Sequence, residues 1–558
     1  MLLTVIFLLA AIIIGRLFYL QVINGKFYAA QALGQQSGFA KVQGQRGQIY
    51  FEKSKDSMGR QGGGEIKSLA INEKKYTVGA VGKNIKDKDA FVVALASQLQ
   101  EKKEVISAKL GESDSYVIIK KNVPAAEAEA LKKIKLAGLS LEEVAGRYYP
   151  QESLASQLVG FVGAAQGEGQ YGLEGYYEDL LKGKQGIQED KRGLSLIGTE
   201  NKEDSLNGSD LYLTVDYNIQ FQAESLLAQA HKDIDIDSGQ IIVLKPDTGR
   251  VLAMANYPAF NPNTYYKQQS LDIFQNSAVQ KIFEPGSVFK PFTMAIALNE
   301  GKVSPESTFV DTGSVTIGPD TVYNFDRKKY DRQTLSGILE KSINTGAVYL
   351  SRLVSHQTFM DYLKKLGFDE KTGIDVQGEV QSRNDLLKKG SDFGFATASF
   401  GQGIEMTPIQ LASAFAVFAN GGRVPKPYMV EKIEHAGDQA VTKPHLSDQV
   451  ISQKTASEVT TMLINVVERG FGSAAKIPGY YMAGKTGTAE VPITNGKGYY
   501  ADKTIQSFIG YGPALKPEFL ILVKLDNPKV PKSSLSAAPI FKKLAQYIIN
   551  YWQLPPDY

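Results

Sequence analysis

The stretch EPGSVFKPFT, residues 284–293, places a serine and a lysine at the start of an apolar segment. Ser287 follows a Pro-Gly pair, and Lys290 comes three residues later. Residues at positions i and i+3 lie on one face of a helix, so the Lys290 amine can reach the Ser287 hydroxyl. A serine hydroxyl becomes an effective nucleophile when a neighbouring base takes its proton. The spacing therefore indicates a Ser-Lys nucleophile pair at the start of a buried helix.

Two further motifs follow in chain order. KSINTG supplies Ser342 and Asn344 on a predicted turn, and AGKTGTAE supplies Lys485 after a short apolar run. The residues that follow this lysine in the third motif are Thr486, Gly487 and Thr488. Together the three motifs provide a nucleophile, a base, hydroxyls that can move protons and a second cation, which is the equipment of acyl transfer.

The two lysines need opposite charge states. To act as a base, Lys290 must have its pKa lowered from about 10.4 toward 7–8, a shift worth roughly 4 kcal/mol. Burial and a second nearby cation both lower a lysine pKa. Because Lys290 is predicted on a core helix and Lys485 on a strand edge facing a cleft, we expect Lys290 to be the more buried lysine and to lose its proton first.

Each motif alone is weak evidence, because the chain contains second copies of all three. Ser473 and Lys476 repeat the serine-x-x-lysine spacing. Residues 371–373 (KTG) lie in a polar loop with no strand before them, and residues 382–384 (SRN) begin a charged helix. The copy at 371–373 is interpreted as a loop connection and the copy at 382–384 as a helix cap. The inference of an active site therefore depends on the order of the three motifs along the chain.

Composition excludes several classes of protein. The chain has 558 residues, which suggests about three or four domain-sized units, with 43% apolar and 22% charged residues. The net charge of +3 does not favour nucleic-acid binding. There is no cysteine, which excludes disulfides and thiolate catalysis, and the four histidines form no zinc-binding pair. No metal site and no cofactor are expected.

The N-terminus predicts a membrane anchor. Residues 2–23 are largely apolar and would form about 33 Å of helix, enough to cross a ~30 Å hydrocarbon core if Arg16 extends toward the interface. A cleaved signal peptide is the alternative, but the small residues at 30–32 lie too far beyond the apolar run. Arg16 and Lys26 both follow the apolar run at 2–14 and argue weakly against a C-terminus outside the cytoplasm, although large domains translocate largely regardless of charge.

The remaining chain divides into two parts that differ in their predicted secondary structure. Residues 24–205 are mixed, with a glycine-rich loop at 62–64, a short strand at 76–81 and a helix at 125–134, and a polar linker spans 202–210. Residues 208–558 are predicted to open with strands, including a hairpin over 239–256, continue with many helices and close with strands at 507–513 and 519–526 and an amphipathic helix. This order predicts an α/β (α+β) domain whose antiparallel sheet is built from both ends of the segment.

The chain resembles a class B penicillin-binding protein, a membrane-anchored D,D-transpeptidase that crosslinks peptidoglycan in cell division or cell-shape maintenance. The three ordered motifs match the set of this family and of the β-lactamases. Similarity extends over nearly the whole chain, through RLFYLQVINGKFY, GRYYPQESLASQLVGFVG, GLEGYYEDLLKGKQG and GQGIEMTPIQLASAFAVFANGG. One departure concerns the N-terminal module: after residues 46–49 the family usually has Asp-Arg, whereas this chain has Tyr50-Phe51 and a polar insert.

The resemblance implies a transmembrane anchor (1–23), an elongated α+β non-catalytic module resembling a pedestal or dimerisation domain (24–205) and a penicillin-binding/β-lactamase-like transpeptidase domain (208–558). Ser287 would be the acylated nucleophile and Lys290 its base. Ser342 would relay a proton to or from the leaving group, Asn344 would hold Lys290 and the substrate backbone, and Lys485 would supply positive potential.

The third motif would bind the donor peptide, which ends in D-Ala-D-Ala. Its carboxylate suits Lys485 and the hydroxyls of Thr486 and Thr488, and Gly487 would let a substrate strand lie close to the sheet edge. The backbone N–H groups of Ser287 and Thr488 would form the oxyanion hole. Other implied partners are β-lactams, the membrane and a SEDS-type glycan polymerase, with the catalytic domain outside the cytoplasmic membrane and no nucleic acid involved.

Three alternatives remain open. A serine β-lactamase shares the motifs but needs a deacylating base and a much shorter chain. A bifunctional penicillin-binding protein needs a glycosyltransferase module, and the N-terminal region shows no acidic pair in the expected setting. A β-lactam sensor or structural scaffold would keep the pocket without turnover and would be favoured by a damaged motif.

Overall fold

The computed structural model describes residues 14, 16–18, 39–52, 66–111, 115–163, 167–189, 206–382, 384–493 and 498–558. Most of the predicted anchor, the glycine-rich loop at 62–64 and residues 202–205 of the polar linker lie outside these residues. Within them, no helix is both long and apolar enough to cross a membrane. The chain forms two compact units, of residues 1–48, 179–210 and 434–439 and of residues 49–178, 211–433 and 440–558.

The smaller unit is built on a two-stranded antiparallel ribbon. Strand β1 (Phe39–Gln43) pairs with β8 (Gln185–Glu189), so that Phe39 faces Glu189 and Gln43 faces Gln185. Backbone hydrogen bonds from Gly47 N–H to the Leu181 carbonyl and from Gly208 N–H to the Gln45 carbonyl continue the pairing beyond the ribbon. Segments far apart in sequence are therefore joined here by main-chain bonds.

In the larger unit, one small core is built on three neighbouring strands of a seven-stranded sheet. Strand β3 (Ser68–Val81) pairs antiparallel with β4 (Tyr116–Pro124) and β5 (Leu139–Tyr148). Three helices pack with these strands around one apolar cluster: α3 (Lys88–Leu99), α4 (Lys103–Leu110) and α5 (Ala125–Ile134). Helix α5 confirms the helix predicted at 125–134. Its sequence is rich in alanine, leucine, glutamate and lysine, which all favour helix. The predicted strand at 76–81 is the end of a much longer one.

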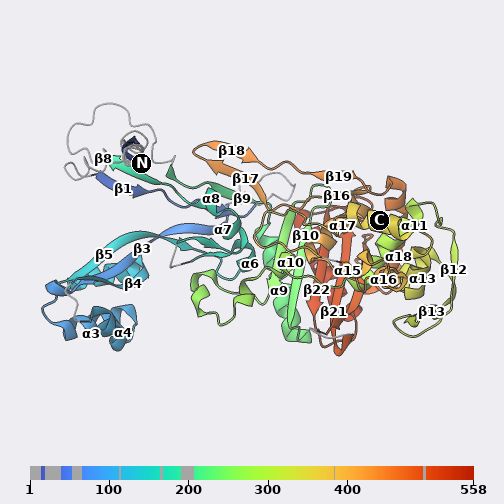
Figure 1. Cartoon of the computed structure of the whole chain (residues 1–558), viewed down its shortest axis with the longest axis horizontal. Coiled ribbons are helices and arrows are strands. Elements are labelled where there is room, and N and C mark those ends of the chain that lie inside the picture. The colour runs from blue at the N-terminus through green and yellow to red at the C-terminus, as the bar shows by residue number, and fades with distance from the viewer. Residues whose placement is uncertain are drawn as a thin grey trace, which may run out of the picture. The chain divides into compact units, whose positions relative to one another are not determined.

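The five-stranded antiparallel sheet of the same unit has the strand order β11-β10-β22-β21-β20. Its early strands are β10 (Ser238–Leu244) and β11 (Val251–Tyr257). Its late strands are β20 (Ala483–Pro492), β21 (Tyr499–Gly512) and β22 (Phe519–Asp526). Figure 1 shows green β10 beside red β22, and the register places Gly239 opposite Leu525. The prediction of an antiparallel sheet made from both ends of the segment is confirmed.

Helices cover this sheet. Phe519, Ile521, Val523 and Leu525 alternate along β22 and join one apolar cluster with α9 (Tyr217–Ile234) and α19 (Ala537–Trp552). Helix α17 (Pro408–Ala419) packs against β10 and β22, and α18 (Gln453–Arg469) packs against β20. Helix α11 (Lys290–Asn299) packs against α18 and is buried from Lys290 to Leu298. The sheet and these helices fix the two ends of the motif set relative to each other.

Candidate active site

The nucleophile motif forms a tight turn that runs directly into a buried helix. Gly286–Phe289 is a 3₁₀ turn, and α11 begins at Lys290 with Pro291 in its first turn, where a missing N–H costs no intrahelical bond. Ser287 is partly exposed, whereas Lys290 is 1% exposed. Lys290 Nζ lies 3.0 Å from Ser287 Oγ. The predicted Ser-Lys contact is confirmed, with the hydroxyl accessible and the amine buried.

Lys290 also contacts the second motif. Its Nζ donates to the Ser342 carbonyl at 2.6 Å and lies 3.0 Å from Ser342 Oγ. Burial lowers the pKa of Lys290 well below its ordinary value, and the nearby charge of Lys485 lowers it further. The amine is thereby disposed to carry a lone pair, and two hydroxyls stand within hydrogen-bond distance of it. This is the geometry that a general base requires.

Ser342 lies in a short loop between α12 (Leu335–Glu340) and α13 (Asn344–Ser351). Its φ of +54° is in the left-handed region, which a residue with a side chain adopts at a cost of about 1–3 kcal/mol and which often marks functional sites. Asn344 differs from the expectation. Its side-chain amide donates to the Tyr323 carbonyl at 2.9 Å, while the three hydrogen bonds of the Lys290 amine go to Ser287 and Ser342. The two side chains are held by different partners.

Lys485 lies on β20, the outer strand of the five-stranded sheet. Its Nζ is 3.1 Å from Ser342 Oγ, 3.1 Å from the Thr486 carbonyl and 3.3 Å from Thr486 Oγ1. The expectation that Lys485 is the more exposed lysine is wrong, because it is 0% exposed and burial lowers its pKa to about 7. Burial lowers the pKa of both lysines, and their mutual repulsion disfavours the state in which both are charged.

The third motif packs directly against the nucleophile turn. A Cβ on Gly487 would lie 2.9 Å from Val288 Cγ1 and 3.0 Å from the Pro285 carbonyl oxygen, so glycine is required for this close approach. The approach of a substrate strand to the sheet edge at Gly487 stays a prediction. Gly286, with φ of +60°, has its own Cβ position 3.0 Å from the Thr488 carbonyl oxygen. Ser287 is therefore held against the edge strand that carries Thr488.

Sequence reasoning missed Glu284, although it lies in the first motif. Its carboxylate is 7% exposed and accepts hydrogen bonds from Gly403 N–H at 3.0 Å and from the Tyr499 hydroxyl at 3.2 Å. Burial raises its pKa to about 7, with smaller contributions in the same direction from Glu405 and Glu490. This side chain ties the nucleophile turn to a loop and to β21. The sequence signal that could have identified Glu284 is its position as an acidic residue directly before the Pro-Gly pair of the nucleophile motif.

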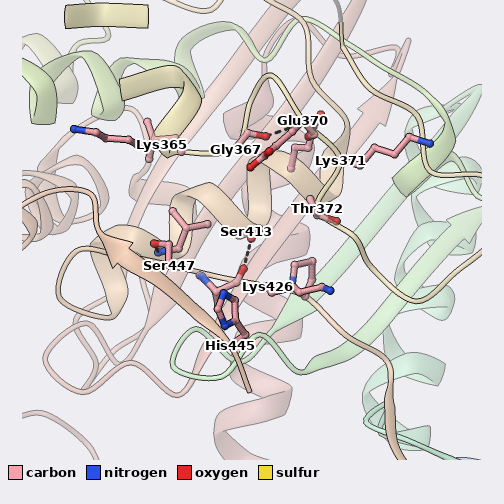
Figure 2. A pocket seen from close by; sticks show the side chains of 14 residues that line it. Lys365, Gly367, Glu370, Lys371, Thr372, Ser413, Lys426, His445 and Ser447 are labelled. Atoms are coloured by element: carbon pink, nitrogen blue, oxygen red, sulfur yellow. Dashed lines mark hydrogen bonds between the residues drawn. The ribbon is translucent and has the colours of Figure 1, made fainter. Parts of the chain in front are cut away.

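The second copies of the motifs take no part in this arrangement. Lys476 pairs with Glu468 and its pKa is raised, mainly by that bond, so it is not a candidate base for Ser473. The loop at 371–373 borders a separate pocket of about 200 Å³, which shares no residue with the three motifs. Figure 2 shows two of its lysines, Lys365 and Lys371, pointing in opposite directions. The cleft that contains Ser287, Ser342, Thr486 and Thr488 has a volume of about 430 Å³.

Comparison with known proteins places this geometry in a family. Residues 239–546 match the model of the penicillin binding protein transpeptidase domain, and residues 41–213 match that of the penicillin-binding protein dimerisation domain. The chain belongs to the penicillin-binding protein transpeptidase family. The first match includes all three motifs and every strand of the five-stranded sheet except the first residue of β10.

Relatives in this family cover most of the chain. Stage V sporulation protein D of Bacillus subtilis is 32% identical over 85% of this chain and 75% of its own length. A peptidoglycan D,D-transpeptidase FtsI homolog of Mesostigma viride is 29% identical over 98% of this chain and 94% of its own. A crystal structure of penicillin-binding protein 3 of Mycobacterium tuberculosis with aztreonam aligns with a TM-score of 0.72 and 26% identity, covering 93% of this chain and 98% of that one.

Proposed function

We propose that this protein is a serine-type peptidoglycan D,D-transpeptidase that crosslinks stem peptides through an acyl-enzyme on Ser287 and is acylated by β-lactams. The observation that carries the proposal is the position of the Lys290 amine, 3.0 Å from Ser287 Oγ and 3.0 Å from Ser342 Oγ. A buried amine whose pKa is lowered can accept the serine proton, which neither a solvated lysine nor an arginine can do near neutral pH.

In the acylation step, neutral Lys290 takes the proton of Ser287 Oγ, which attacks the carbonyl carbon of the penultimate D-Ala of the donor. The backbone N–H groups of Ser287 and Thr488 donate to the oxyanion that forms. The proton then passes from Lys290 to the Ser342 hydroxyl, which lies 3.0 Å from the amine, and from there to the departing nitrogen. The C–N bond breaks, D-alanine leaves, and an ester of Ser287 remains.

In the transfer step, the amine of a second stem peptide attacks the ester carbon from the side that D-alanine vacated. A C–N bond forms, the C–Oγ bond breaks, and the amine proton returns to Ser287 through Ser342 and Lys290. Lys485 and the hydroxyls of Thr486 and Thr488 bind the donor carboxylate before this step. Lys485 performs this role while protonated, and its pKa of about 7 leaves a substantial charged fraction at neutral pH. A bound carboxylate increases that fraction.

The proposal includes the cellular setting. Residues 1–23 form a single-pass anchor in the cytoplasmic membrane, residues 24–205 form a non-catalytic module, and residues 208–558 form the catalytic domain outside the cytoplasm. The apolar composition of residues 2–14 and the family membership support this arrangement. A SEDS-type glycan polymerase is the proposed partner, since crosslinking requires newly polymerised glycan strands. Co-purification from crosslinked membranes tests that partner.

Covalent labelling with a fluorescent penicillin tests the catalytic proposal. Wild-type protein and Ser473→Ala should label, Ser287→Ala should not, and the label should be released slowly. Labelling of Ser287→Ala at the wild-type rate would overturn the site assignment. Rapid release would instead identify a β-lactamase, and labelling without any transfer of a thioester donor to an amine would identify a sensor or scaffold.

A further inference from the structure

A fully buried carboxylate is bonded to the segment that carries the second motif. Asp311, the last residue of β12 (Thr308–Asp311), is 0% exposed. Its two oxygens accept four hydrogen bonds, from the Thr345 hydroxyl at 2.6 Å, Gly313 N–H at 2.8 Å, Tyr330 N–H at 2.8 Å and Asn324 Nδ2 at 2.9 Å. The Thr345 and Asn324 side chains are buried as well. Because Thr345 directly follows Asn344, this carboxylate is joined to the start of α13.

Asn324 makes a second connection between Asp311 and α13. The N-cap residue of this helix, Ile343, has no polar side chain to accept the first N–H groups of the helix. Asn324 Oδ1 accepts them instead, from Asn344 N–H at 3.1 Å and from Thr345 N–H at 3.3 Å. Its Nδ2 donates to two acceptors, one of which is Asp311. A reversed amide would turn NH₂ toward N–H donors and oxygen toward acceptors, so Asp311 fixes the direction of the cap.

This cap holds the loop that carries Ser342. The φ of Ser342 is +54°, a conformation that persists only where the surrounding structure imposes it. On one side the loop is held by Ile343 N–H, which donates to the Ile338 carbonyl at 2.9 Å, and on the other side by Asn324. Ser342 Oγ must stay close to both catalytic lysine amines, which lie 3.0 and 3.1 Å from it. A shift of about 1 Å in such a group can cost about 10²-fold in rate.

We infer that Asp311 and Asn324 are positioning residues for proton transfer, which hold the Ser342 hydroxyl where it can pass a proton between Lys290 and the reacting nitrogen. The inference rests on the proposed transpeptidase function and adds two residues that act through the loop and not on the reacting atoms. The same carboxylate holds Tyr330 N–H, and the 324–330 loop lines the cleft together with Ser342. One buried group therefore fixes both the rim of the cleft and the proton relay.

This role has a kinetic consequence that a purely structural role lacks. The carboxylate of a β-lactam is bound by the third motif on β20, whereas the hydrogen bonds of Asp311 and Asn324 within the described residues go to other segments. The proton transfer of the chemical step depends on Ser342. Loss of the bonds around Asp311 should therefore lower the limiting rate of acylation and leave the half-saturating concentration of penicillin little changed.

The experiment measures the acylation rate of full-length protein in detergent against the concentration of a fluorescent penicillin. Thr345→Val replaces the hydroxyl by a methyl group, Asn324→Ala removes the cap, and Asp311→Ala removes the acceptor of all four bonds. Each should lower the limiting rate by about 10–100-fold. Thr345→Ser keeps the hydroxyl and should retain most of the rate. Because Thr345→Val changes the shape of the side chain least, its comparison with Thr345→Ser decides the question even where a larger change prevents folding.

Asp375→Asn is the matched control. Asp375 does not line the cleft, and its carboxylate likewise accepts several hydrogen bonds, from Met429 N–H at 2.7 Å, Val430 N–H at 2.8 Å and the Tyr177 hydroxyl at 3.0 Å. Its melting temperature should fall while its limiting acylation rate equals that of wild type.

Two outcomes would overturn this inference and leave the transpeptidase proposal intact. One is a wild-type limiting rate in Thr345→Val, with or without a lower melting temperature. The other is a defect in that variant that consists only of a raised half-saturating concentration, which would mean that the bonds shape binding and not proton transfer. Absence of labelling in wild type, or labelling of Ser287→Ala at the wild-type rate, would instead overturn the proposed function together with the inference.

Discussion

Replacement of Lys290 by arginine tests whether the buried amine is the base. An unperturbed lysine with a pKa of about 10.4 is neutral at pH 7 in only about one molecule in 2,500, so holding it neutral requires about 4–5 kcal/mol from its surroundings. Complete burial and the neighbouring charge of Lys485 lower the pKa in the required direction. A guanidinium has a pKa above 12 and keeps its proton in any such site. Lys290→Arg should therefore acylate about 10²–10⁴-fold more slowly, the usual contribution of a general base.

The assay is the second-order rate constant of acylation by a fluorescent penicillin, measured from pH 5 to pH 10. For wild type the rate should rise with pH as the lysine pair loses its first proton, at an apparent pKa well below that of free lysine. It should fall again above about pH 7 as Lys485 loses the charge that attracts the carboxylate of the drug. Lys485→Arg keeps that charge at all these pH values, so its falling limb should disappear while activity drops less than in Lys290→Arg.

Lys476→Arg is the control, because Lys476 lies in the second serine-x-x-lysine copy and pairs with Glu468. Its profile should match wild type. An acylation rate in Lys290→Arg within tenfold of wild type would refute the base assignment. So would a wild-type rate that stays flat until pH 10.

Three further predictions follow from the same structure. Residues 208–558 alone should be soluble and bind penicillin, as gel filtration and labelling would show. An insoluble or unlabelled fragment would mean that the predicted domain boundary is wrong. For Glu284, a folded-state pKa of about 7 against an ordinary 4.5 means that its contribution to stability is fully present below pH 4.5 and is lost as pH rises through 7. Glu284→Gln does not titrate, so its unfolding free energy in urea should gain up to about 3 kcal/mol relative to wild type between pH 4.5 and pH 8, and a constant difference would contradict this. Gly487→Ala should lose about 1–3 kcal/mol of stability and slow acylation, because its Cβ would press on Val288 and the Pro285 carbonyl; unchanged melting and labelling would show that the turn can move.

The sequence anticipated those parts of the site that depend on local spacing. The reach from Lys290 to Ser287 follows from helix geometry, and the hairpin of β10 and β11 follows from two apolar runs separated by a turn. It did not anticipate contacts made by packing between distant segments. Glu284 meets Gly403 and Tyr499, which lie more than 100 and 200 residues away, and no pattern near any of them signals the meeting.

The burial of Lys485 has the same origin. A lysine at the start of an edge strand is ordinarily solvated, but here α18 and the nucleophile turn pack against β20, and Ser342 Oγ lies 3.1 Å from the Lys485 amine. Packing gives Gly487 a further reason to be glycine, since Val288 and Pro285 occupy the space that its missing side chain leaves. In both cases the residue type was recognised, and its physical reason required the fold.

The strand order of the five-stranded sheet has a consequence for how the chain reaches its native state. Strand β22 lies between β10 and β21, so residues 238–244 stay without one neighbour until residues 519–526 have been synthesised. Pairing across so long a stretch of chain is slow to form. In the meantime the apolar strand IIVL presents an open edge to other chains, which favours aggregation. A nascent chain of this protein therefore cannot close its central sheet before residue 526 has been synthesised, and a chaperone that binds it earlier would meet an unpaired strand edge.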